Sequence, residues 1–132
     1  MHVVKHYDMR LCVIFILTLF LLSGSGALSV EKAGSAFTVH GRLSFYNGTP
    51  SFRIWIVGSK RVLGIRQNDD EQPDVPKELR RLISLDRDIF ADFIVEPLTP
   101  SKPGVMQTVK VLSASRIVVT EGKKIVLKKD KL

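Results

Sequence analysis

Residues 38–57 have the sequence TVHGRLSFYNGTPSFRIWIV, and this stretch decides the fold. Apolar and polar side chains alternate along it on both sides of Asn47-Gly48, a period of two that is typical of strands with one buried face. An Asn-Gly pair tolerates the positive φ angles that tight hairpin turns need. The pattern therefore predicts an antiparallel hairpin made of strands 38–46 and 51–57.

The hairpin determines which side chains share a face. Because the connection between Tyr46 and Ser51 has an even length, even-numbered residues of the first strand lie on the same side as odd-numbered residues of the second. A turn at Gly58-Ser59 extends this pattern into a third strand, 60–66, and places Gly64 beside Arg53. One side carries the predicted core, which comprises Leu43, Phe45, Phe52, Ile54 and Ile56. The solvent-facing side carries His40, Arg42, Tyr46, Arg53 and Trp55.

An acidic, turn-rich loop at 67–74 separates these three strands from the rest of the domain. Asp74 can cap a short helix that has Pro76 in its first turn and ends near Leu85. The helix has one narrow apolar face, made of Leu79, Leu82 and Ile83. Three apolar segments then predict further strands, at 89–96, 105–112 and 116–120.

The order of elements is three strands, one helix and two or more strands, with Gly41 in the middle of a long first strand. Over residues 37–113 this order resembles the OB-fold, a five-stranded Greek-key barrel with a helix between its third and fourth strands. We therefore expect a mainly β protein: a small antiparallel barrel, OB-fold-like, with five to six strands and one short helix between strands three and four. Another small antiparallel barrel or a sandwich is the alternative. Residues 42–55 also resemble small secreted bacterial proteins of unassigned role.

Residues 1–27 have the organisation of a secretory signal peptide. Lys5 and Arg10 precede an apolar run, Leu11–Leu22, which is followed by small residues up to Ala27. The run is shorter than the roughly 20 residues that a membrane-spanning helix needs. We expect cleavage after Ala27, a secreted or periplasmic protein, and no transmembrane segment in the mature chain. The alternative is an N-terminal membrane anchor.

The rest of the chain divides into a single β-barrel domain, 28–122, and a basic C-terminal tail, 123–132. The only cysteine, Cys12, lies in the apolar N-terminal run, so the mature chain has no thiol and no disulfide. The formal net charge is +7, and the tail holds five lysines and one aspartate. Because so much of the positive charge lies in the tail, the composition argues against a uniformly basic nucleic-acid-binding surface.

The solvent-facing side of the first three strands is the candidate ligand surface. Guanidinium groups bind phosphate or carboxylate, and aromatic faces stack on bases or sugar rings. The OB-fold resemblance implies that these strands bind ligand together with loops 47–50 and 98–104. The predicted ligand-binding residues are Arg42, Tyr46, Arg53, Trp55, Arg66 and Lys102. The alternative is that the helix or the tail covers Trp55, and that the arginines only keep this face hydrated.

The sequence contains no pattern that selects catalytic or metal-binding residues. His40 is the only histidine after residue 27, so a histidine pair for a metal is excluded there and a catalytic triad would need His40. The carboxylates of residues 69–74 lack the spacing of EF-hand calcium ligands. We therefore expect no catalytic residues, no metal site and no cofactor, with His40 an ordinary strand residue and Asp92 a strand-edge residue.

These features predict an exported, non-enzymatic binding module for an anionic or sugar-containing partner, such as nucleic acid, an envelope polymer or a protein. One alternative is a small secreted hydrolase or nuclease that uses carboxylates and a divalent cation. Another is a structural or interaction protein of the cell envelope with no small ligand. The tail is either an edge strand guarded by lysines, which we favour, or a segment that adheres to an anionic membrane surface or polymer.

Overall fold

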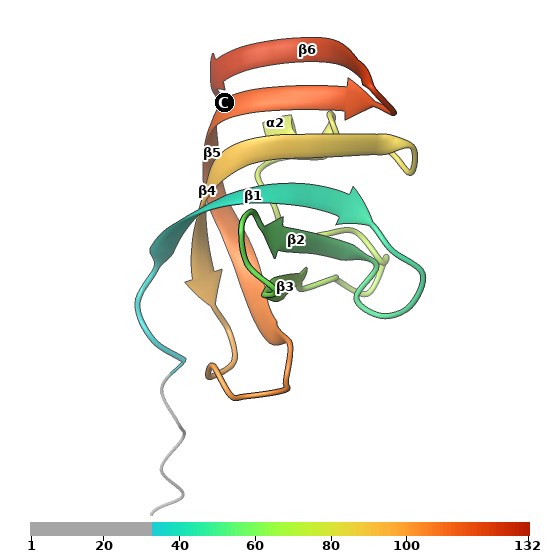
Figure 1. Ribbon diagram of the computed structural model, residues 1–132. Coiled ribbons are helices and arrows are strands. Elements are labelled where there is room, and N and C mark those ends of the chain that lie inside the picture. The colour runs from blue at the N-terminus through green and yellow to red at the C-terminus, as the bar shows by residue number, and fades with distance from the viewer. Residues whose placement is uncertain (1–32) are drawn as a thin grey trace, which may run out of the picture. The chain divides into compact units, whose positions relative to one another are not determined.

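Six strands and one short helix make up the part of the chain that the computed structural model describes, residues 33–132 (Figure 1). The strands are β1 (Phe37–Phe45), β2 (Phe52–Ile56), β3 (Val62–Ile65), β4 (Arg87–Pro97), β5 (Gln107–Glu121) and β6 (Lys124–Lys131), and the helix is α2 (Lys77–Arg80). The predicted signal peptide and its cleavage site after Ala27 lie outside these residues. Within 33–132, no helix is long and apolar enough to cross a membrane.

Five of the strands close into a ring. The sheet order is β3-β2-β1-β4-β5-β6, and β3 also pairs with β5, so the ring runs β1-β2-β3-β5-β4 and back to β1. The closing pair is parallel and joins 63–65 to 107–109, whereas the other pairs of described strands are antiparallel. The fold is therefore the small, mainly β, OB-fold-like barrel expected from the sequence. The short helix lies between β3 and β4, and the closure is parallel rather than antiparallel.

The predicted side-chain parity of the first three strands is confirmed. Leu43 pairs with Ile54 and Arg42 with Trp55 across β1 and β2, and Arg53 pairs with Gly64 across β2 and β3. The backbone N–H of Tyr46 donates to the carbonyl oxygen of Ser51 at 2.7 Å and closes the four-residue connection. Since successive side chains of a strand point to opposite faces, this register sends one set of side chains into the barrel and the other to solvent.

The inward-pointing side chains of the five ring strands fill the core. Its largest fully buried side chains are Leu43, Ile54, Leu63, Ile65, Leu79, Ile89, Phe93, Val95, Val109, Val111, Ile117 and Val119. Each contributes about 1.5–3 kcal/mol by leaving water. Phe45, Phe52 and Ile56, which the parity also assigns to the interior, are half-buried at its margin, where Phe45 and Phe52 pack edge to face at 5.7 Å. Leu79 anchors the short helix to this core.

The helix is shorter than the predicted 74–85 segment. Asp74 does not cap it, because its backbone is part of the barrel wall: its N–H donates to the carbonyl of Arg66 and its carbonyl accepts from the N–H of Val111. After Arg81 the backbone forms hydrogen bonds of the 3₁₀ type, between residues three apart. An example is the 2.9 Å bond from the N–H of Leu82 to the carbonyl of Leu79. Leu82 and Ile83 still pack against the core, as their spacing predicts.

The strands predicted at 105–112 and 116–120 are a single strand, β5. Its polar middle does not end it, because it stays paired with β4 on one side and gains β6 on the other. The strand bends at Arg116, which has a positive φ of 49°. There Phe90 pairs with Val118 and Asp92 with Ser115, so two residues of β5 oppose one residue of β4, which is a β-bulge.

The segment set apart as a basic tail, 123–132, contributes strand β6. This strand pairs antiparallel with the second half of β5 and lies at the end of the sheet order, outside the five-stranded ring. Its residues are all exposed. The tail is therefore the edge strand that the sequence analysis favours, and it is continuous with the barrel sheet.

The packing of Gly41 gives a test of this fold. A Cβ at this position would lie 2.4 Å from Cγ2 of Ile54 and 3.1 Å from the carbonyl oxygen of Trp55. We expect Gly41→Ala to lower the free energy of unfolding by about 1–3 kcal/mol in urea titrations, because overpacking strains the core. In an Ile54→Ala background, which removes the clashing methyl group, the same change should cost less. Equal costs in both backgrounds would contradict this packing argument.

Candidate ligand-binding face

Four of the predicted ligand-binding residues come together on the outer side of β1 and β2 and just after β1. We call this group, Arg42, Tyr46, Arg53 and Trp55, the arginine–aromatic face. The guanidinium carbon of Arg42 lies 5.3 Å from the centroid of the Trp55 ring, and that of Arg53 lies 5.2 Å from the Tyr46 ring. Both are cation–π distances. The face therefore consists of two stacked cation–aromatic pairs, with all four residues half-buried.

Arg42 lies on β1, which has β2 on one side and β4 on the other. Its register partners are Trp55 on β2 and Phe90 on β4. Its Nε atom is buried and has no hydrogen-bond partner. Among residues 33–132, no carboxylate forms an ion pair with Arg42. Stacking on Trp55, rather than an ion pair with a described carboxylate, thus holds its guanidinium group.

Arg53 and Trp55 are each fixed by one hydrogen bond to a neighbouring turn. The Nε–H of Arg53 donates to the carbonyl of Pro50 at 2.9 Å, which ties it to the 47–50 loop. The indole Nε1–H of Trp55 donates to the carbonyl of Ser59 at 2.7 Å, in the turn between β2 and β3. These bonds orient both side chains before any ligand arrives, which lowers the entropy cost of binding.

Arg66, the fifth arginine or aromatic residue predicted to bind ligand, is paired with a carboxylate outside the arginine–aromatic face. Arg66 forms an ion pair with Asp74, and its side chain is 53% exposed. It lines a separate hollow of about 430 Å³ with residues 67–69, Pro73, Asp74 and Arg80. A guanidinium group that is already paired has less to gain from an anionic ligand. Arg66 is therefore the predicted residue that fits the candidate site least well.

Lys102 lies on the β4–β5 loop and lines a cleft of about 610 Å³. Among residues 33–132, the cleft is lined by Lys60, Arg61, Val62 and residues 101–107, and three of these side chains are cationic and none is acidic. Val62 is the register partner of Trp55 on β3, so it marks where the cleft meets the arginine–aromatic face. Arg61 hydrogen-bonds Gln107 and lies 5.7 Å from the Phe37 ring.

Sequence reasoning missed Lys60 and Arg61 as members of this site. Both follow directly after the Gly58-Ser59 turn, which the sequence does predict. Their contribution depends on the parallel pairing of β3 with β5, because this pairing brings the β4–β5 loop beside them. No pattern within a single strand signals that contact.

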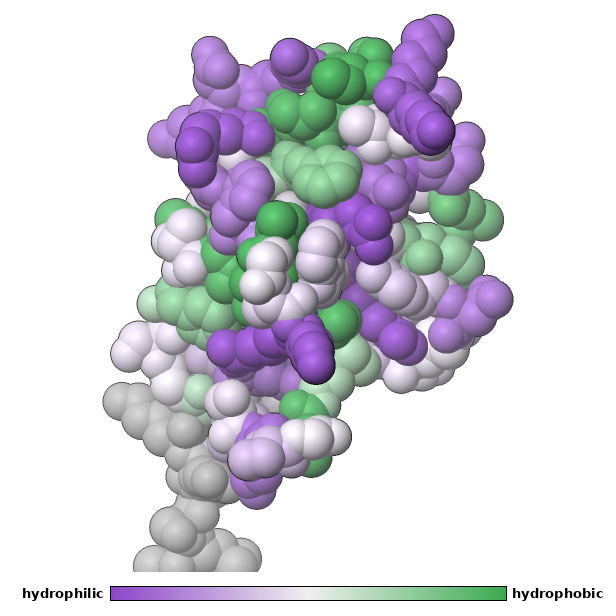
Figure 2. Space-filling view, viewed as in Figure 1, coloured by the Kyte–Doolittle hydropathy of each residue, from purple (hydrophilic) through white to green (hydrophobic). Residues whose placement is uncertain are grey.

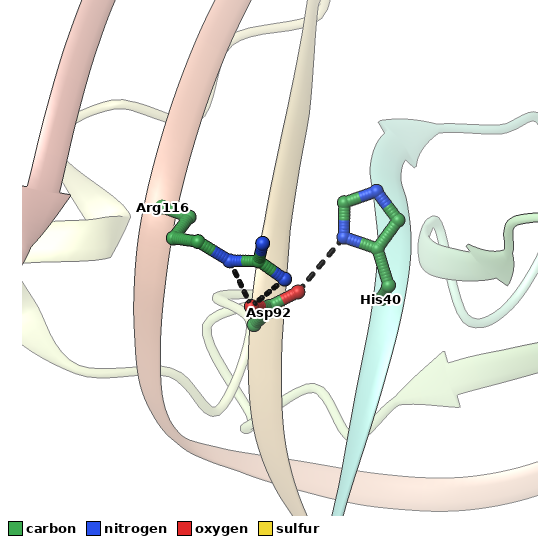
Figure 3. Close-up of polar contacts among 3 residues, drawn as sticks. All are labelled: His40, Asp92 and Arg116. Carbon is green, nitrogen blue, oxygen red and sulfur yellow. Dashed lines mark hydrogen bonds and ion pairs between the residues drawn. The ribbon is translucent and has the colours of Figure 1, made fainter.

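A second polar cluster crosses three neighbouring strands on the outer face (Figure 3). Nδ1 of His40 on β1 donates to Oδ1 of Asp92 on β4 at 2.8 Å, and Arg116 on β5 bonds the other carboxylate oxygen of Asp92. The bond from Arg116, and then that from His40, hold the pKa of Asp92 below its ordinary value, against the opposing effect of burial. His40, expected to be an ordinary strand residue, and Asp92, expected to be a strand-edge residue, are thus joined by a hydrogen bond.

In the part of the chain that is described, no group of three or more histidine, cysteine, aspartate or glutamate side chains is placed to hold a metal ion. No protein-family model, curated protein or solved structure matches this chain. The functional conclusion therefore depends on the physical character of the site.

The Asp92 cluster predicts a pH-dependent contribution to stability. A carboxyl group whose pKa is lowered in the folded state, from an ordinary 3.8, stabilises the fold above about pH 4, and this stabilisation is lost as the pH falls through the folded-state pKa. We expect Asp92→Asn to lower the free energy of unfolding by about 1 kcal/mol at pH 7 and by less near pH 2. Asp69→Asn, in the exposed loop, is the matched control and should have no such pH dependence. A pH-independent loss for Asp92→Asn would contradict the assignment.

Proposed function

We propose that this protein is an exported, non-enzymatic binding module, and that its arginine–aromatic face binds an anionic polymer with planar rings or sugar rings. The observation that carries this proposal is the pair of stacked contacts, Arg42 with Trp55 and Arg53 with Tyr46, on one solvent-facing surface. Removal of residues 1–27 by signal peptidase is part of the proposal and is supported by their sequence pattern.

The chemistry of stacked arginine suits such a ligand. A guanidinium group that lies over an aromatic ring keeps its N–H edge for phosphate, sulfate or carboxylate oxygens. The aromatic ring in turn offers an edge or face on which a base or sugar can stack. Alternating cations and rings therefore match a polymer in which charged groups and rings alternate.

The adjoining cleft extends this surface. Lys60, Arg61 and Lys102 line it, and its lining among residues 33–132 includes no acidic residue, which favours anions along the path from Arg42 to the β4–β5 loop. A ligand that spans face and cleft would meet Trp55 and then Val62, which are cross-strand neighbours. This continuity supports a linear ligand over a compact one.

Trp55 is the only tryptophan in the chain and reports directly on the face. We expect its fluorescence to change when an oligothymidylate of about ten nucleotides or a polygalacturonate fragment is titrated in at about 50 mM salt, with affinity that falls as salt rises. Arg42→Ala should weaken binding by about tenfold, since it removes a charge-assisted contact and the stack. Arg81→Ala, which removes an exposed arginine after α2, is the matched control for net charge.

Two results would overturn the proposal. One is an unchanged Trp55 spectrum with both polymers at low salt. The other is an equal loss of affinity in Arg42→Ala and Arg81→Ala, which would assign binding to overall charge rather than to this face. Circular dichroism of each variant shows that the fold is retained before the affinities are compared.

A further inference from the structure

The outer edge of β6 has no strand beside it in the part of the chain that is described. The strand pairs with β5 along one edge only and ends the sheet order. All eight of its residues are exposed. Such an edge presents a row of unpaired backbone N–H and C=O groups, which is the template for adding another strand.

The centre of this edge strand is apolar. Ile125, Val126 and Leu127 are 50%, 37% and 37% exposed. In the space-filling view, hydrophobic side chains gather along the top of the molecule, over β6, with hydrophilic side chains on either side (Figure 2). An edge strand whose side chains serve only to prevent pairing with another strand would carry charged residues at its centre. In β6 the lysines instead lie on either side of an apolar centre.

The apolar side chains of β6 point to both faces of the sheet. Leu127 pairs with Val119, whose side chain points into the barrel, and Ile125 pairs with Thr120, the next residue of β5. A register shift between these two pairs lies at Val126. A flat membrane surface would contact one face of the strand only, whereas a strand added alongside extends both faces.

The positive charge of residues 123–132 favours an acidic partner. Residues 123–132 carry five lysines and one aspartate. Two copies of β6 side by side would bring like charges together, which disfavours pairing between copies of this chain. A strand with acidic residues flanking an apolar centre would instead pair oppositely charged side chains across the new ladder.

We infer that the free edge of β6 binds an extended segment of a partner protein, acidic at both ends and apolar in the middle, as a seventh strand of the sheet. Backbone hydrogen bonds would supply the register, and the lysines would supply the preference for acidic segments. This surface lies at the opposite end of the sheet order from β2 and β3 and does not depend on the proposed polymer site.

The test uses the full chain and short labelled peptides. The probe is Glu-Glu-Val-Thr-Val-Glu-Glu, capped at both ends and followed by fluorescence anisotropy at about 50 mM salt. We expect binding that weakens about tenfold for Gln-Gln-Val-Thr-Val-Gln-Gln, which lacks the charges. Binding should be abolished for Glu-Glu-Val-Pro-Val-Glu-Glu, which keeps the charges and loses a backbone donor. A double variant, Lys128→Glu with Lys129→Glu, should also abolish it.

The controls distinguish strand addition from charge attraction, membrane binding and self-association. Arg42→Ala should bind the peptide normally, so failure of this inference and failure of the proposed function are distinguishable. Equal binding of the threonine and proline peptides would overturn the inference in favour of simple charge attraction. Binding to vesicles of phosphatidylglycerol without binding to any peptide would assign the edge to an anionic membrane. Self-association in sedimentation runs without peptide would assign it to a second copy.

Discussion

The register between β1 and β2 is the constraint on which the rest of the structure depends. Pairing Leu43 with Ile54 sends one set of side chains into the barrel and leaves Arg42 and Trp55 side by side outside. A slip of one residue would exchange the two sets, placing guanidinium groups in the core and leucine and isoleucine in water. The same register therefore secures the hydrophobic core and assembles the candidate ligand-binding face.

Closure of the ring adds the second half of the site. Because β3 pairs with β5, the β4–β5 loop lies beside the β2–β3 turn, and their cations share one cleft. Gly64, in the closing strand, is covered by Pro50 and Met106, whose side chains would lie 2.6 Å and 3.2 Å from a Cβ at that position. The glycine thus lets two loops approach the outer face of the barrel. A larger residue there would push apart the elements that form the site.

The long strands β4 and β5 carry features of a different kind. A β-bulge at Arg116 bends β5 and directs its side chain to Asp92, which also binds His40 from β1. Beyond the bend β5 stays paired with β4 and has β6 rather than β3 on its other side, so its first half closes the barrel and its second half carries the edge strand. The molecule thereby combines a barrel with a protruding sheet edge, and the two candidate surfaces lie on different strands.

Local pattern alone was sufficient for the first hairpin, for the side-chain parity that joins Arg42 to Trp55 and Arg53 to Gly64, and for the apolar face of the short helix. These follow from alternation and turn chemistry between neighbours in the chain. The early end of the helix, the continuity of β5, the pairing of Arg66 with Asp74 and the cationic cleft were decided by tertiary structure. For the continuity of β5 and the cationic cleft, a segment far away in the sequence supplies the hydrogen bonds or the charge, and the periodicity of one strand does not indicate which segment that is.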